Sequence, residues 1–306
     1  MVALLFPGQG SQFVGMGKEL ASAEAVARQV FEEADDALGI ALSKLAWEGP
    51  EDELTLTLNA QPAILIHSIA VYRTVSDRVG QVAFAAGHSL GEFSAYVAAG
   101  TMSLVDAVKT VRRRGELMYR SGQERPGTMA AILGLTDEKV EQVCLDTSAA
   151  GGQCVAANYN SPNQVVISGD VPTVQKAMEL AKAAGAKRAV QLNVSGAFHS
   201  PLMTDAVAGL QAQLDTVALK APAFPIVSNV TAKPVSDVVD VRRLLVEQLT
   251  TPVRWTTSMQ YLLGAGVRDF VELGPGEVLC GLLKRIERSA TCRAVATSAD
   301  LEVASA

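Results

Sequence analysis

Histidine and cysteine are both scarce in this sequence, which limits the metal chemistry available to it. The 306 residues include three histidines and four cysteines, and the cysteines form neither a CxxC pair nor a cluster with the spacing of zinc ligands. A histidine-rich metal site is therefore not expected. We interpret the cysteines as buried free thiols in a reducing compartment. They are Cys144, Cys154, Cys280 and Cys292.

Long apolar runs and blocks of positive charge are also missing. The longest apolar stretch, PAILIHSIAVY at 62–72, falls short of the roughly 20 residues that span a bilayer. The first residues, MVALLFPGQGSQ, lack the basic start of a signal peptide, and their apolar run ends at Pro7. The net charge is −6, and RRR at 112–114 is the longest basic run. We therefore expect a cytoplasmic protein with no membrane or nucleic-acid partner. We also expect it to be a monomer.

The composition that remains is that of a folded protein with a sizeable core. Hydrophobic residues make up 49% of the chain and charged residues 19%. Strands are predicted at 2–6 and 81–87, and they alternate with helical patterns. Strands that alternate with helices predict an α/β fold built on a parallel sheet. The predicted helices of this part lie at 17–39, 62–77, 91–100 and 104–122.

The pattern changes after residue 124. Strands at 127–135, 153–159, 164–169 and 187–194 enclose helices at 136–149 and 171–185. This β-α-β-β-α-β order is the ferredoxin-like one. After residue 200 the chain returns to alternating helices and strands. We therefore predict a discontinuous large domain, 1–124 and 197–306, with a small ferredoxin-like subdomain inserted at 125–196.

The segment GHSLG at 87–91 fits the GxSxG pattern of a nucleophile elbow, between a predicted strand and a predicted helix. Such a turn is crowded, so its neighbours are glycines, and it exposes the Ser89 hydroxyl. It also directs the backbone N–H of Leu90 and the helix N-terminus toward a reacting carbonyl oxygen. The alternative is an ordinary strand–turn–helix with an incidental serine.

A serine nucleophile needs a base, and the sequence offers three histidines. His88 adjoins the serine, but neighbouring side chains diverge on such a turn, so we expect it to pack beneath the elbow. His67 lies in an apolar helix and is expected in the core. His199 follows a strand and a glycine, with Ser200 as a helix N-cap and Pro201 as the first helical residue, and is our choice. No acid is marked as its partner; a backbone carbonyl could orient the ring instead.

Two further segments leave alternatives open. FPGQGSQ at 6–12 is a glycine loop that follows a strand, but it lacks the GK[ST] of a phosphate-binding loop. One interpretation is that the backbone N–H of Gln9 is a second oxyanion donor. The alternative is that the loop is an ordinary turn between a strand and a helix. In VRRRGELM, helical phase turns Arg113 toward solvent, whereas either Arg112 or Arg114 could be buried and bind a carboxylate or phosphate.

Several short motifs, weak singly but specific together, follow one another along the chain. They are FPGQGSQ, QPAIL, GHSLGE, the Arg-Gly of RRRGELM, AANYNSPNQVVISG, GAFHSPLM, PVRW and ELGPG. The same motifs occur in the same order in bacterial malonyl-CoA:acyl carrier protein transacylases, and the sequence resembles that family over nearly its whole length. Acyltransferase domains of polyketide and fatty acid synthases are similar.

The resemblance implies an α/β-hydrolase-like large domain and a role for each matching residue. Ser89 matches the nucleophile and His199 the base, while the N–H groups of Gln9 and Leu90 match the oxyanion donors. Gln248 matches the glutamine whose backbone carbonyl holds the histidine.

Two further matches concern the acyl group. Arg114, directly before the glycine, matches the residue that binds the free carboxylate of malonyl. Phe198 resembles the malonyl-preferring version of its motif, because the ring would crowd a 2-methyl group.

The resemblance also implies the reaction. Malonyl would pass from malonyl-CoA to Ser89 and then to the phosphopantetheine thiol of holo acyl carrier protein, without a cofactor, to supply fatty acid synthesis. A serine esterase or thioesterase is the alternative enzyme, against which Arg114 and the inserted subdomain count. An inactive carrier-docking module is the non-enzyme alternative, but both Ser89 and His199 are present.

Overall fold

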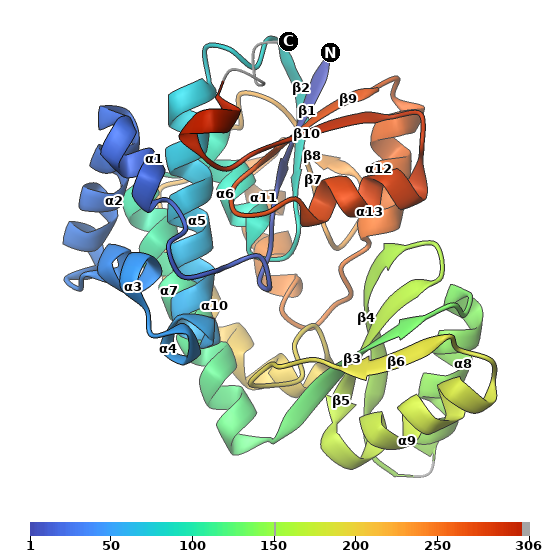
Figure 1. The fold of residues 1–306 in the computed structure, drawn as a ribbon. Helices are drawn as coiled ribbons and strands as arrows, with labels where there is room; N and C mark the ends of the chain where they lie inside the picture. Colours follow the sequence, from blue (N-terminus) through green and yellow to red (C-terminus); the bar gives the residue numbers. More distant parts are fainter. Residues whose placement is uncertain (150, 302–306) are drawn as a thin grey trace.

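A computed structural model describes residues 1–149 and 151–301, which form two sheets with helices around them (Figure 1). The larger sheet has the strand order β10-β9-β1-β2-β7-β8. All neighbouring strands pair in parallel except β8, which is antiparallel to β7. The strands are β1 (Val2–Phe6), β2 (Val82–Gly87), β7 (Ile226–Val227), β8 (Pro234–Val235), β9 (Asp269–Leu273) and β10 (Thr291–Val295).

Helices cover both faces of this sheet, because its central strand is apolar on both sides. On β1, Leu4 and Phe6 belong to one core and Ala3 and Leu5 to the other, as the two-residue period of a strand requires. The first core includes α5 (Thr57–Val75) and α7 (Leu104–Glu124); the second includes α12 (Trp255–Gly264) and α13 (Val278–Ile286) (Figure 1). The other helices around this sheet are α1 (Lys18–Ala23), α2 (Ala25–Leu38), α3 (Leu42–Glu48), α4 (Glu51–Thr55), α6 (Gly91–Ala98), α10 (Thr204–Asp215) and α11 (Val238–Glu247), with 3-10 turns at Pro201–Met203 and Ser298–Asp300.

The smaller sheet has the order β4-β5-β3-β6, and all of its pairings are antiparallel. Two helices pack on it around a separate core, and the chain order is the predicted β-α-β-β-α-β. The mixed α/β fold, with a parallel sheet and a ferredoxin-like insertion, is therefore as predicted. We propose 125–196 as the bounds of the subdomain. Its elements are β3 (Gly127–Leu133), α8 (Asp137–Ala149), β4 (Cys154–Ser161), β5 (Gln164–Asp170), α9 (Val171–Ala183) and β6 (Arg188–Gln191).

The two sheets meet at the segment around Val253. Its N–H donates to Ala157 O at 2.8 Å, and its carbonyl accepts from Tyr159 N–H at 2.9 Å. These bonds attach β4 of the small sheet to the loop that precedes α12. Asn158 and Asn160 of β4 line the same cavity as Gln9 and Ser89, which follow β1 and β2.

The prediction of four free thiols is wrong for one pair. Cys280 on α13 and Cys292 on β10 form a disulfide, with Cα atoms 5.3 Å apart. The reason is topological: β10 pairs with β9, and α13 connects the two strands, so positions twelve apart come together. Cys144 and Cys154 are free and buried, with their sulfur atoms 3.7 Å apart. Cysteine usage therefore no longer supports a reducing compartment.

None of the helices in the described part of the chain is long and apolar enough to cross a membrane.

Candidate active site

The turn between β2 and α6 carries Ser89 at a positive φ of 52°, a conformation that is rare for a residue with a side chain. The flanking glycines make this turn possible. A Cβ on Gly87 would collide with the backbone of Gly91, and a Cβ on Gly91 would collide with the carbonyl of Phe6. The turn is therefore held against the end of β1, and the serine is lifted above the carboxyl ends of the parallel strands.

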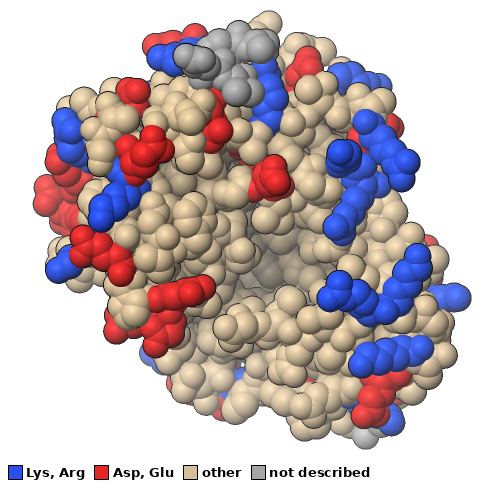
Figure 2. Space-filling model, viewed as in Figure 1, with Lys and Arg blue, Asp and Glu red and all other residues tan. Residues whose placement is uncertain are grey.

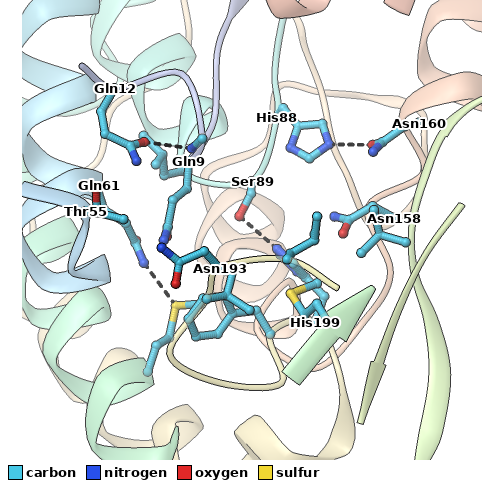
Figure 3. A pocket seen from close by; sticks show the side chains of 18 of the residues that line it. Gln9, Gln12, Thr55, Gln61, His88, Ser89, Asn158, Asn160, Asn193 and His199 are labelled. Carbon is cyan, nitrogen blue, oxygen red and sulfur yellow. Dashed lines mark hydrogen bonds between the residues drawn. The ribbon is translucent and has the colours of Figure 1, made fainter. Parts of the chain in front are cut away.

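His199 lies against this serine. Its Nε2 is 2.8 Å from Ser89 Oγ (Figure 3). Its Nδ1 is 2.9 Å from the backbone carbonyl of Gln248. Since a carbonyl can only accept, Nδ1 carries the proton and Nε2 is free to take one from the serine. Ser200 caps the following 3-10 turn, and Pro201 is its first residue, as predicted.

The electrostatic surroundings keep this imidazole neutral. Burial, followed by the positive charge of Arg114, lowers the pKa of His199 to about 3. A neutral imidazole is the form that accepts a proton, and His199 is in that form over the physiological pH range.

The other two histidines are engaged elsewhere. His88 Nε2 lies 2.9 Å from Asn160 Oδ1, and the ring packs near Trp255. The ring lines the cavity beside the elbow, whereas we predicted that it would lie beneath it. His67 is 1% exposed within α5, and its Nε2 contacts the carbonyl of Ala296 at 2.8 Å, as expected for a core residue.

The three arginines of α7 have different surroundings. The Arg113 side chain is 43% exposed, and Arg112 is more buried, with its Nη1 3.2 Å from the carbonyl of Leu58. That carbonyl lacks its usual helical donor because Pro62, four residues on, has no N–H. Arg114 is 1% exposed and reaches the elbow, with Nη2 3.0 Å from Ser89 Oγ. Helical phase did not show whether Arg112 or Arg114 is the buried arginine, and the structure shows that it is Arg114.

Arg114 is held by neutral partners. Its guanidinium donates to Gln61 and, at 3.0 Å, to Gln248 Oε1, and it lies over the ring of Phe93. Gly115 makes this position possible, because a Cβ there would lie 2.6 Å from Leu58 Cα, where α7 meets α5. Burial lowers the pKa of Arg114 to about 10, so it stays charged at neutral pH. Its Nε has no hydrogen-bond partner among the described residues.

These groups line a cavity of about 320 Å³ between the two sheets (Figure 3). It lies in the hollow at the centre of the face in Figure 2, with uncharged residues around the opening. The predicted residues Gln9, Leu90, Phe198, Ser89, His199 and Arg114 all line it, and Gln248 lies directly behind.

Sequence reasoning missed several polar side chains that share the cavity. Gln61 was inside a quoted motif, and a glutamine in an otherwise apolar helix was the available signal. Asn158 and Asn160 also stood in a quoted motif, but nothing in the sequence showed that β4, the segment after β6 and the elbow line one cavity. The missed residues are Gln12, Gln61, Asn158, Asn160 and Asn193.

Within residues 1–149 and 151–301, no group of three or more His, Cys, Asp or Glu side chains is placed to hold a metal ion.

Comparison with known proteins places this arrangement in a family. Residues 3–302 match the model of the acyl transferase domain. The chain belongs to this family. It is an acyltransferase, and it is 48% identical over 303 residues to a malonyl CoA-acyl carrier protein transacylase of Bacillus subtilis, covering 99% of this chain and 96% of that protein. It is 44% identical over 295 residues to the Escherichia coli K12 protein of the same name, covering 96% and 95%.

Solved structures are similar throughout. An acyl-carrier-protein S-malonyltransferase from Bartonella henselae superposes on the acyltransferase with a TM-score of 0.95 at 44% identity, covering 99% of this chain and 98% of that one. A malonyl-transacylase solved in complex with its type II PKS acyl carrier protein gives 0.96 at 42% identity, with the same coverage. The predicted family and fold class are confirmed.

Proposed function

We propose that this acyltransferase moves the malonyl group of malonyl-CoA to the phosphopantetheine thiol of acyl carrier protein, through an ester on Ser89. The names of its relatives support this substrate pair. The observation that carries the proposal is Arg114. A buried guanidinium beside the nucleophile, held by neutral groups and with a free Nε, is suited to an acyl group that bears a carboxylate.

In the first half-reaction, His199 Nε2 takes the Ser89 proton while Oγ attacks the thioester carbonyl. The negative oxygen is stabilised by the N–H groups of Gln9 and Leu90. The C–S bond breaks, and the proton on His199 passes to the CoA sulfur. The Gln248 carbonyl stabilises the imidazolium through Nδ1 during this step.

The second half-reaction reverses these roles. His199 takes the proton of the carrier thiol, the sulfur attacks the malonyl ester, and the proton returns to Ser89 as the C–O bond breaks. The transfer is therefore ping-pong and needs no cofactor.

Two residues select the acyl group. Arg114 holds the malonyl carboxylate, which fixes the carbonyl over Ser89. The Phe198 ring, 5% exposed and next to the base, limits space beside the carbon between the carboxylate and the thioester. The product supplies fatty acid synthesis, and the enzyme works as a monomer.

Intact-mass analysis tests the proposal. Malonyl-CoA should add one malonyl group to the wild-type chain and none to Ser89→Ala. Holo acyl carrier protein should then remove the group and gain it. Persistent labelling of Ser89→Ala would contradict the nucleophile, and rapid loss to water without carrier would indicate an esterase.

A further inference from the structure

Two buried polar side chains behind the nucleophile take no part in the reaction just described. Glu92 lies in the first turn of α6 and is 0% exposed, and Asn229 follows β7 and is 1% exposed. Burying a carboxylate and an amide costs free energy unless they are hydrogen-bonded, so their contacts indicate their role.

Asn229 spans the nucleophile elbow. Its Oδ1 accepts from the N–H of Ser89 at 2.7 Å, and its Nδ2 donates to the carbonyl of Gly87 at 2.7 Å. These two backbone groups flank His88, where the chain turns too sharply to continue either the strand or the helix. The loop itself is fixed by Arg254, whose N–H donates to Asn229 O at 3.0 Å. One side chain therefore holds both sides of the turn.

Glu92 ties this loop to the residue that orients the base. A single oxygen, Oε2, accepts from Asn229 N–H at 3.1 Å and from Gln248 Nε2 at 2.7 Å. Gln248 in turn donates to the carbonyl of Ser89 at 3.1 Å and accepts from Arg114, while its own carbonyl accepts from His199. The nucleophile, the base and the arginine thus all connect to this oxygen.

We propose that Glu92 and Asn229 are positioning residues of acyl transfer, acting as one unit that sets the distance between Ser89 and His199. The unit works through the acceptor at Oε2 and not through negative charge. This inference rests on the proposed function. A displacement of about 1 Å at such a site can cost about 100-fold in rate, so loss of the unit should lower kcat with little effect on KM.

The chemistry of Glu92 supplies a sharp test. In Glu92→Gln the amide carbonyl can occupy the place of Oε2 and accept both hydrogen bonds, whereas Glu92→Leu provides no acceptor. We expect acylation of Ser89 by malonyl-CoA to stay within about threefold of wild type in Glu92→Gln and to fall about 100-fold in Glu92→Leu. A loss in Glu92→Gln as large as in Glu92→Leu would overturn the acceptor role.

Asn229→Ala should show the same kcat loss as Glu92→Leu. Because the two residues act as a unit, removing both should cost little more than removing one. The rate of the double variant Glu92→Leu/Asn229→Ala should lie within about threefold of that of the slower single variant. Additive losses, or a change in KM alone, would overturn the proposal. If Glu92→Leu does not fold, Asn229→Ala and Glu92→Gln carry the test.

Ser94→Ala is the matched control. Ser94 is buried on the same helix, and its hydroxyl has no hydrogen-bond partner among the described residues. Its rate should be unchanged. Melting temperatures of all variants distinguish positioning from stabilisation of the fold. A rate loss that follows a fall in melting temperature would show that Glu92 and Asn229 only stabilise the fold.

The pH profile gives an independent readout. The charged group facing Glu92 is Arg114 of α7, the neutral ones are Asn229, Gln248 and Ser228, and Tyr96 lies on its own helix. Burial raises the pKa of Glu92 to about 7. Since a protonated carboxyl still offers an acceptor, wild-type and Glu92→Gln rates should follow one profile from about pH 6 to about pH 8. A wild-type limb near pH 7 that Glu92→Gln lacks would show that the charge is required, against the proposal.

Failure of this inference is distinguishable from failure of the proposed function. If wild type is not acylated by malonyl-CoA, the proposed function fails. If wild type is acylated and Glu92→Leu and Asn229→Ala react as fast, only the positioning role fails.

Discussion

Arg114 carries a positive charge out of water, and no described carboxylate lies within ion-pair distance of it. Gln61, Gln248 and Ser89 supply only neutral oxygens. A substrate carboxylate would therefore be its first direct anionic partner. This makes the residue both a binding group and the source of acyl selectivity in the proposed reaction.

Arg114→Ala should lower kcat/KM for malonyl-CoA by roughly 10- to 100-fold, because a hydrogen bond to a charged group contributes about 1.5–3 kcal/mol. The rate with acetyl-CoA should fall much less, so the malonyl-to-acetyl ratio of acylation rates is the measurement. Arg113→Ala, on the exposed face of the same helix, is the control. An unchanged ratio in Arg114→Ala would refute the carboxylate role.

His199 should give the acylation rate an unusual pH dependence. Burial and Arg114 both disfavour the imidazolium, so the pKa of the base lies at about 3 and the ring stays neutral as pH falls through 6.5. We expect no acid limb near pH 6.5 in the acylation rate of wild type. Arg114→Ala removes the second-largest cause of the lowered pKa and should move the limb to higher pH. A wild-type limb near 6.5 would mean that the base is exposed to water or is another group.

At the scale of elements, the disulfide fastens α13 to the edge strand β10. It closes a loop of twelve residues, for which chain entropy predicts a stabilisation of about 3 kcal/mol. Cys280→Ser/Cys292→Ser should therefore lower the melting temperature, and reductant should lower that of wild type but not of the variant.

Alkylation counts the thiols directly. Denatured, unreduced protein should take up two alkyl groups, at Cys144 and Cys154, and reduced protein four. Uptake of four groups without reductant would show that the bond does not form.

Periodicity predicted the main elements well where each helix or strand has a single apolar pattern. It failed at short elements and breaks. The predicted helix 17–39 is two helices, because Glu24 is extended, with φ −115° and ψ 116°. α5 begins five residues before Pro62, although proline usually marks a helix start, because Arg112 satisfies the carbonyl that Pro62 leaves free. β10 is half-exposed at the sheet edge, without the apolar run of a central strand.

For the whole molecule, Glu272 makes stability depend on pH. It is fully buried behind α13, and burial raises its pKa to about 7 despite bonds from the N–H groups of Leu279 and Cys280. The folded state therefore binds more protons than the unfolded state between about pH 4.5 and about pH 7, so the free energy of unfolding falls as pH rises through this window.

Glu272→Gln removes this contribution. We compare the drop in the free energy of unfolding between about pH 5 and about pH 8. This drop should be smaller in Glu272→Gln than in wild type, by about 3 kcal/mol. Urea unfolding at each pH measures the difference. Glu32→Gln, on the exposed side of α2, should follow wild type. Equal slopes for Glu272→Gln and wild type would contradict the raised pKa.

The candidate site was only partly predictable from sequence. Ser89 and His199 could be chosen from local patterns, because an elbow and a capped helix start are local structures. Arg114 could not be separated from Arg112 by helical phase and needed the resemblance to a family. Glu92 and Asn229 were missed, since their contacts link α6 to the loop after β7, 137 residues away. Such a pairing exists only once the sheet order is known.

The insertion of one sheet into the chain of the other has a consequence for how the enzyme is made. On the ribosome, Ser89 emerges 110 residues before His199, with the whole small sheet between them. β9, which pairs with β1 in the middle of the large sheet, emerges later still. A nascent chain released before Gln248 therefore carries Ser89 without the Gln248 carbonyl that contacts the ring of His199. In the proposed mechanism such a chain lacks an oriented base, so it should not consume the thioester substrate.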